Sequence, residues 1–163
     1  MMPHAFTRPG LGDAGFQGFV TFAALRADKF AGVPQAGGAY VVLREADSVP
    51  AFLPANPGGR CKGKDPTLPP TKLQERWVAG AHVIYIGKAN DLRRRLRQYS
   101  RFGAGQAVGH WGGRMIWQLA QADQLVVAWR EVAAAQPPAQ LESSLLNAFC
   151  MQYGSLPFAN RRF

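Results

Sequence analysis

The sequence predicts an α/β (α+β) fold: a small, mainly antiparallel, three-stranded sheet flanked by helices. Three short runs rich in β-branched and aromatic residues indicate strands, at 38–44, 82–86 and 125–129. Two segments that begin near Leu92 and Pro138 instead repeat apolar residues at helical spacing. The second strand meets the first of these helices through a glycine turn, and we expect the functional site at that junction.

Length and composition favour one domain that binds a polyanion. Residues 1–163 are expected to form a single domain with its core at 38–44 and 82–160. A formal charge of +9 favours nucleic acid or an anionic surface as the partner. The chain has no apolar run near the roughly 20 residues of a membrane helix and no signal-peptide pattern, so we expect a cytoplasmic protein. Cys61 and Cys150 are predicted to be free thiols, and the oligomeric state, monomer or homodimer, is left open.

The junction at 82–101 runs from a strand into a helix. Gly87 is expected to end the strand, and Asn90 or Asp91 to cap the helix. At 100° per residue, Arg95 lies about 40° from Tyr99 and so at the margin of the buried face. That face comprises Leu92, Leu96 and Tyr99, whereas Arg93, Arg97 and Arg101 are expected on the outer side.

This junction is also strongly basic. Asp91 is the one acidic residue between positions 82 and 101, so the element repels itself unless an anion lies nearby. A solvated amphipathic helix is the simpler alternative, but the excess of charge favours a polyanion as the neighbour. The residues expected to contact it here are Lys88, Arg93, Arg94, Arg97 and Arg101.

The last predicted helix, which starts at Pro137 and Pro138, carries a carboxylate on its apolar face. Glu142 falls near the centre of the stripe, and burying an unpaired charge costs several kcal/mol. Its partner is therefore expected to be an arginine, a dense set of hydrogen-bond donors or a metal ion. The apolar stripe itself comprises Leu141, Leu145, Leu146, Phe149 and Tyr153.

These residues resemble the signature of the GIY-YIG nuclease family. Tyr85-Ile86-Gly87, followed by Lys88-Ala89, Leu92 and Arg95, is similar to the second half of that signature. Gly38-Ala39-Tyr40, followed by Val41-Val42-Leu43, is similar to the first half, and Glu142 and Asn160 match the C-terminal positions. The sequence departs from the pattern at Ala39, where isoleucine is usual, and in the long insertion between the two halves.

The resemblance implies a Mg²⁺-dependent (or Mn²⁺-dependent) DNA endonuclease that acts in repair, recombination or the processing of mobile-element or phage DNA. It implies that Tyr40 is the general base, helped by Tyr85 and Lys88. Arg95 would hold the scissile phosphate, and Glu142 would be the metal ligand. Tyr99 would hydrogen-bond near the phosphate, and Asn160 would be a local structural or phosphate-orienting group. A catalytically silent, basic DNA-binding module is the alternative.

An insertion at 45–81, rich in proline and glycine, separates the two expected strands. Its middle carries Arg60, Lys62 and Lys64 among glycines that would let the backbone approach a ligand closely. We expect it to lie beside the active-site face and to contact flanking DNA backbone; a solvated loop is the equal alternative. Its end, 73–78, is expected to form a short helix that packs Trp77 into the core.

The remaining segments are expected to support this core. Residues 1–37 should form an arm and then a helix over 18–30. A helix is also expected from about His110, with Trp111, Met115 and Leu119 as its apolar stripe, although Gly112 and Gly113 weaken the pattern. His110 and Arg114 are expected to face the substrate, local packing being the simpler alternative for His110.

Overall fold

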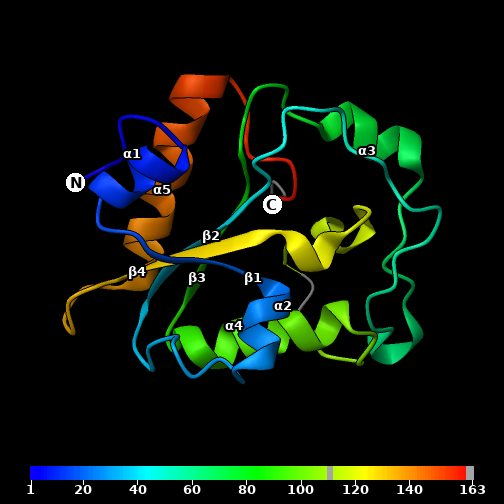
Figure 1. Cartoon of the computed structure of the whole chain (residues 1–163), viewed down its shortest axis with the longest axis horizontal. Helices are drawn as coiled ribbons and strands as arrows, with labels where there is room; N and C mark the ends of the chain where they lie inside the picture. The colour runs from blue at the N-terminus through cyan, green and yellow to red at the C-terminus, as the bar shows by residue number, and fades with distance from the viewer. Residues whose placement is uncertain (110–111, 161–163) are drawn as a thin grey trace.

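The structure, a computed structural model, describes residues 1–109 and 112–160. Over these residues a four-stranded antiparallel sheet has the order β1-β4-β2-β3 (Figure 1). The strands are β1 (Gln17–Thr21), β2 (Gly38–Leu43), β3 (Val83–Ala89) and β4 (Val126–Glu131). The α-helices are α1 (Arg8–Asp13), α2 (Phe22–Ala27), α3 (Pro70–Arg76), α4 (Leu92–Gly103) and α5 (Pro138–Tyr153). Three short 3₁₀ helices are η1 (Cys61–Gly63), η2 (Arg114–Gln118) and η3 (Ala122–Gln124).

The general class predicted from the sequence is therefore observed, but the sheet has a fourth strand. The segment expected to be helical over 18–30 instead forms β1 and only then the short helix α2. Thr21 caps that helix, because its hydroxyl accepts a hydrogen bond from Ala24 N at 3.1 Å. Residues 17–21 form a strand because they pair with β4, and the pairing contains a bulge between Gly18 and Val20. Local helical periodicity is overridden here by a partner strand more than 100 residues away in the sequence.

Helices cover both faces of the sheet. One face packs against α2, α4 and η2 and contains Tyr40 and Tyr85, while the other packs against α1 and α5. Figure 1 shows α1 beside α5 and α2 beside α4, with the sheet between these pairs. The predicted stripe of α5 is observed: Leu141, Leu145 and Phe149 are buried, and Leu146 and Tyr153 are partly buried. Among the described residues, no helix is both long and apolar enough to cross a membrane.

The junction between β3 and α4 is close to its prediction, except at Gly87. Gly87 does not end the strand but lies inside it, opposite Tyr40 in the register. A Cβ on Gly87 would lie 2.5 Å from Cζ of Tyr40, so the glycine makes room for that ring. Of the two candidate caps, Asp91 is the one used: its Oδ1 accepts a hydrogen bond from Arg94 N at 3.0 Å.

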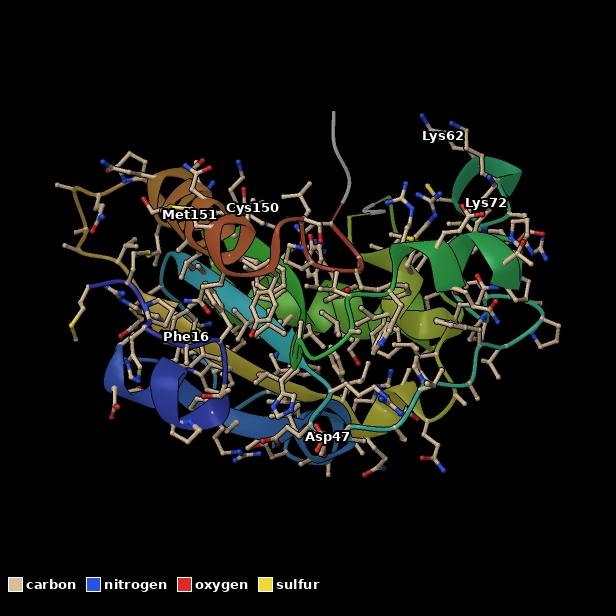
Figure 2. All side chains as sticks on the ribbon, turned by 90° about the horizontal axis from the view of Figure 1, so that it is seen from above. Phe16, Asp47, Lys62, Lys72, Cys150 and Met151 are labelled. Atoms are coloured by element: carbon tan, nitrogen blue, oxygen red, sulfur yellow. The ribbon has the colours of Figure 1, made fainter. Side chains whose placement is uncertain are left out.

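The insertion is folded onto the domain. Its predicted short helix is α3, and Trp77, one residue beyond it, packs against Phe52 and Phe158. Gly58 and Gly59 are buried, and a Cβ on Gly58 would lie 2.5 Å from the Phe102 ring. These two glycines therefore do not approach a ligand as expected: Gly58 makes room for the Phe102 ring, and Gly59 packs against the backbone of Gln106. Figure 2 shows Lys62, from the same segment, and Lys72 of α3 toward one end of the molecule, away from α5.

The segment after α4 also differs from its prediction. The expected helix is the 3₁₀ helix η2, which starts at Arg114 after Gly113 adopts a left-handed conformation with φ of +74°. Met115 and Leu119 are buried as predicted. His110 and Trp111 lie outside the described residues.

The open edge of β3 is covered by the C-terminal segment. Ala159 N donates to Ile84 O at 2.8 Å. One residue later, the Asn160 side chain accepts from Ile86 N at 3.0 Å and donates to Ile86 O at 2.9 Å. The amide thus completes the backbone hydrogen bonds of the residue that follows Tyr85.

We predict that Asn160→Ala lowers the free energy of unfolding by about 1 to 2 kcal/mol, because two backbone hydrogen bonds of an edge strand are lost. Urea denaturation followed by circular dichroism measures this change. Asn90→Ala is the matched control, since Asn90 is exposed. Equal losses of unfolding free energy in both variants would show that the bonds between Asn160 and Ile86 do not stabilise the edge strand.

Candidate functional site

Three tyrosines and one arginine gather between the sheet and α4. Tyr40 comes from β2, Tyr85 from β3 and Tyr99 from α4, and their ring centroids lie 5.7 to 6.1 Å apart. The Arg95 guanidinium carbon lies 5.2 Å from the Tyr99 ring centroid and 6.0 Å from that of Tyr40. The structure therefore brings together four of the predicted site residues from three separate elements.

Arg95 is the most deeply placed cation of the helix. It is only 6 % exposed, consistent with its predicted place at the margin of the buried face. One terminal nitrogen, Nη2, donates to Gly112 O at 3.5 Å. Within the described part of the chain, the other, Nη1, makes no hydrogen bond of ordinary geometry, and neither does the Tyr40 hydroxyl, although Tyr85 and Arg95 lie close enough to influence its pKa. Two buried polar groups of one cluster thus retain unused hydrogen-bonding capacity, which is costly in a folded protein.

A glycine turn that sequence reasoning treated only as a weakness of a helix completes the cluster. The Tyr99 hydroxyl donates to Gly113 O at 2.5 Å. A Cβ on Gly113 would collide with that hydroxyl and lie 2.8 Å from Cζ of Tyr85. Gly113 was the available signal, because a side chain at this position would fill the space that the Tyr99 hydroxyl and the Tyr85 ring occupy.

Burial dominates the electrostatics of the three phenols. It raises the pKa values of Tyr40 and Tyr99 well above the ordinary tyrosine value, and Arg95 offsets this only in part. The pKa of Tyr85 is also raised by burial, with Arg95 as the largest opposing influence. The sequence placed six basic residues near these tyrosines, but Arg95 is the one that acts on all three. In the free protein, the cluster is therefore neutral apart from its guanidinium.

Glu142 lies on α5, across the edge strand from this cluster. Its side chain is 21 % exposed, and Oε1 lies 4.0 Å from Lys88 Nζ on β3. Burial raises the pKa of Glu142, and Lys88 lowers it by less. Glu142 also raises the pKa of Tyr85, which places the carboxylate within electrostatic reach of the phenol. Lys88 is thus its nearest cation, at the limit of an ion pair, and no arginine bridge to it is observed among the described residues.

A surface hollow of about 300 Å³ opens beside Arg95. Its walls include the basic side chains of Lys88, Arg94 and Arg95, together with Gln98 of the next helical turn. Lys88 and Arg94 are exposed. The hollow therefore brings solvent to Arg95 along walls on which three basic residues outnumber the one acidic residue, Asp91.

Two arginines of α4 that were expected on its outer side instead hydrogen-bond to the loop before β2. Arg93 donates from Nε to Val33 O at 2.8 Å and from Nη2 to Ala31 O at 3.0 Å. Arg97 donates from Nη2 to Lys29 O at 3.3 Å. The two arginines thus donate hydrogen bonds to backbone carbonyls of this loop and fasten it to α4. Arg101 is exposed, as predicted.

The basic residues expected in the insertion and after α4 have mixed environments. Lys62 and Lys64 are exposed, whereas Arg60 pairs with Asp65 at 3.3 Å. Arg114, expected to face the substrate, is instead 8 % exposed and donates from Nε to Pro66 O at 3.4 Å. Its guanidinium holds the insertion because the backbone of η2 points it inward. The same expectation for His110 falls outside the described residues.

The potential metal ligands of the described residues occur singly or in pairs. No group of three or more His, Cys, Asp or Glu side chains there could hold an ion. Glu142, half-buried and without a strong ionic partner, is the carboxylate nearest the tyrosine cluster. A lone carboxylate of this kind fits Mg²⁺, which keeps several waters and takes other ligands from substrate phosphate.

Comparison with known proteins adds nothing to this geometry: no protein-family model, curated protein or solved structure matches the chain. The interpretation of the site therefore rests on its own residues.

We predict that Glu142→Gln raises the free energy of unfolding at pH 7, by an amount on the order of 1 kcal/mol. Because burial raises the pKa of Glu142, the folded protein binds a proton more tightly than the unfolded chain, and ionisation costs stability. The cost is fully present above the raised pKa and disappears below the ordinary carboxyl pKa. Urea titrations at pH 7 and pH 4 test this, with exposed Glu75→Gln as control. A destabilised variant at pH 7 would show that the Lys88 contact outweighs burial.

Proposed function

We propose that the protein is a Mg²⁺-dependent (or Mn²⁺-dependent) endonuclease of the GIY-YIG type that hydrolyses DNA phosphodiester bonds. The observation that carries the proposal is Arg95: a buried guanidinium with an unpaired nitrogen, stacked among tyrosines beneath a basic hollow. A buried donor without a partner costs stability, and Arg95 differs from Trp117, whose Nε1 is also unpaired within the described residues, because it carries a positive charge and lines the hollow. A phosphate oxygen entering the hollow would accept from it.

Arg95 would hold the scissile phosphate. Its planar guanidinium stays protonated and offers parallel donors that match two phosphate oxygens. Because the aromatic rings of Tyr40 and Tyr99 exclude water around it, the charge acts at low dielectric, where it stabilises a developing negative charge most. Lys88 and Arg94 are exposed on the walls of the hollow and would attract the phosphate backbone of DNA toward it.

Tyr40 and Tyr85 would orient the attacking water. The Tyr40 hydroxyl has no hydrogen-bond partner among the described groups, so it is available to accept the water's proton. Burial raises the pKa of Tyr40, so we propose that a free phenolate does not accumulate. As the water's proton arrives, Tyr40 would pass its own proton to the Tyr85 hydroxyl, and Tyr85 would release one to solvent; Arg95 stays protonated and stabilises the charge that develops.

Glu142 would bind the divalent ion, with remaining ligands supplied by water and substrate phosphate. A bound Mg²⁺ would neutralise charge on the leaving 3′ oxygen. Glu142 is suited to this because Lys88, its nearest cation, stands at 4.0 Å and can move away. Asn160 would act indirectly, since it holds the backbone next to Tyr85.

The other end of α4 offers a surface for flanking DNA. A trough of about 420 Å³ lies between α2 and α4, and its basic lining comprises Arg26, Lys29, Arg97 and Arg101. Arg26 pairs with Asp123, but Lys29 and Arg101 are exposed. Exposed cations on both sides of the trough, Lys29 beyond α2 and Arg101 on α4, favour contact with phosphates.

A silent DNA-binding module is the second candidate, and one observation favours it: burial raises the pKa of all three tyrosines, as in an ordinary aromatic core. Both candidates use the same basic surface. Cleavage of DNA that depends on Mg²⁺ separates them, because the binding module would retain DNA without cutting it.

We predict that Glu142→Gln abolishes cleavage, by at least about a hundredfold in kcat, while DNA affinity changes little. The amide keeps the shape of the side chain but loses the charge that would bind the metal. Supercoiled and branched DNA in Mg²⁺ provide the cleavage assay, with Glu75→Gln as the control. Near-normal cleavage by Glu142→Gln would refute the metal-ligand role.

We predict that Arg95→Ala lowers kcat by about a hundredfold or more, whereas Arg101→Ala mainly weakens binding. Arg101 is the matched arginine on the same helix, exposed rather than buried. Its loss should reduce the slope of log affinity against log salt by about one phosphate contact. Similar losses of turnover in both variants would contradict a distinct role for Arg95.

A further inference from the structure

The insertion is fastened to the segment that follows α4 by a series of buried hydrogen bonds. The Gln118 side chain donates to Leu53 O at 2.9 Å and to Leu68 O at 2.7 Å, and accepts from Leu68 N at 3.0 Å. The backbone adds bonds from Leu53 N to Gln118 O and from Ala120 N to Ala51 O. Gln118 is fully buried. The two segments therefore form one continuous unit.

The same insertion also grips the C-terminal end of α4. Gly59 N donates to Phe102 O at 2.9 Å, which satisfies a carbonyl in the last turn of the helix. Gly58 lies against the Phe102 ring so closely that a Cβ would not fit. Since α4 carries Arg95 and Tyr99, the insertion contacts the site's helix as well as the segment after it.

Asn56 links these contacts to the turn formed by Gly112 and Gly113. It is 5 % exposed, and its Nδ2 donates to Arg114 O at 3.0 Å. Its Oδ1 accepts from Gly58 N at 2.8 Å, and its backbone N donates to the Thr67 hydroxyl at 2.9 Å. Asn56 thus ties both sides of the insertion to the residue directly after Gly113.

The carbonyls next to Arg114 are those that the cluster uses. Gly112 O accepts from Arg95, and Gly113 O accepts from Tyr99. Arg114 in turn donates to Pro66 O of the insertion, so the tie runs in both directions. A turn of two glycines has little stiffness of its own. Its position must therefore be set by what holds its ends.

We infer that Asn56 is a positioning residue: through Arg114 it fixes the Gly112-Gly113 turn, and the turn fixes Arg95 and Tyr99. The insertion is, on this view, a brace for the site rather than a loop added for DNA contact. The consequence for catalysis rests on the proposed nuclease function, whereas the mechanical link can be tested without it. Misplacement of a catalytic group by about 1 Å costs up to roughly a hundredfold in rate.

The test variant is Asn56→Ser. A serine hydroxyl can still accept from Gly58 N in a local turn but is too short to reach Arg114 O. Gln118→Met is the control: it removes the three side-chain bonds to Leu53 and Leu68 and keeps the Asn56 link. Asn56→Asp, equal in size and unable to donate when ionised, is the second variant should the serine form fail to fold.

For cleavage, Asn56→Ser should lower kcat about tenfold to a hundredfold with KM changed less than about twofold. Gln118→Met should lower the urea midpoint but keep kcat, in assays where both variants are folded. In an Arg95→Ala background, Asn56→Ser should add a smaller loss than in the wild type, because only the Tyr99 contact with the turn then remains. Equal falls in kcat for the Asn56 and Gln118 variants, or additive losses with Arg95→Ala, would overturn the inference.

Hydrogen exchange of the Tyr99 hydroxyl proton, which is donated to Gly113 O, tests the link separately when it is followed by NMR without DNA or metal. Asn56→Ser should raise its exchange rate about tenfold relative to wild type, and Gln118→Met should leave it unchanged. Faster exchange without any cleavage by the wild type would retain the brace and refute the nuclease. Unchanged exchange in Asn56→Ser would refute the brace whatever the enzyme does.

Discussion

The burial of one arginine among three aromatic rings is the constraint on which the site depends. Arg95 is only 6 % exposed, and its guanidinium is stabilised by the negative ring faces of Tyr40 and Tyr99. The Gly112 carbonyl also accepts a hydrogen bond from it. Each contact comes from a different element: β2, α4 itself and the turn before η2. The sheet, the helix and the turn must therefore all be in place before Arg95 has an environment at all.

Stability and proposed function oppose each other at this site. Unused donors on Arg95 and the Tyr40 hydroxyl, and a half-buried Glu142 held only loosely by Lys88, each cost free energy in the folded protein. The remainder of the fold compensates with two apolar cores on opposite faces of the sheet. Such costs are expected where polar groups are kept available for a ligand rather than satisfied internally.

Small residues shape the site as much as the charged ones do. Gly87 accommodates the Tyr40 ring, and Gly113 accommodates the Tyr99 hydroxyl and the Tyr85 ring. The contacts between the long insertion and the domain also shape the site, because buried polar side chains there hydrogen-bond to backbone segments instead of projecting into solvent. Asn56 and Gln118 each satisfy backbone groups from two segments of the chain. A Pro- and Gly-rich insertion can thus be structural where its few polar residues are buried.

Local signals in the sequence were enough to predict the strand at Tyr85, the helix that follows it and the apolar stripe of α5. They left the cap open between Asn90 and Asp91 and ended the strand two residues early, at Gly87. The sequence could not determine β1, because helical periodicity after Gly18 is overruled by pairing with β4. Nor could it show that Arg114 turns inward or that burial raises the tyrosine pKa values, since both depend on what distant segments cover. Only the tertiary structure decided these points, because desolvation and long-range pairing are properties of the packed chain rather than of any window of its sequence.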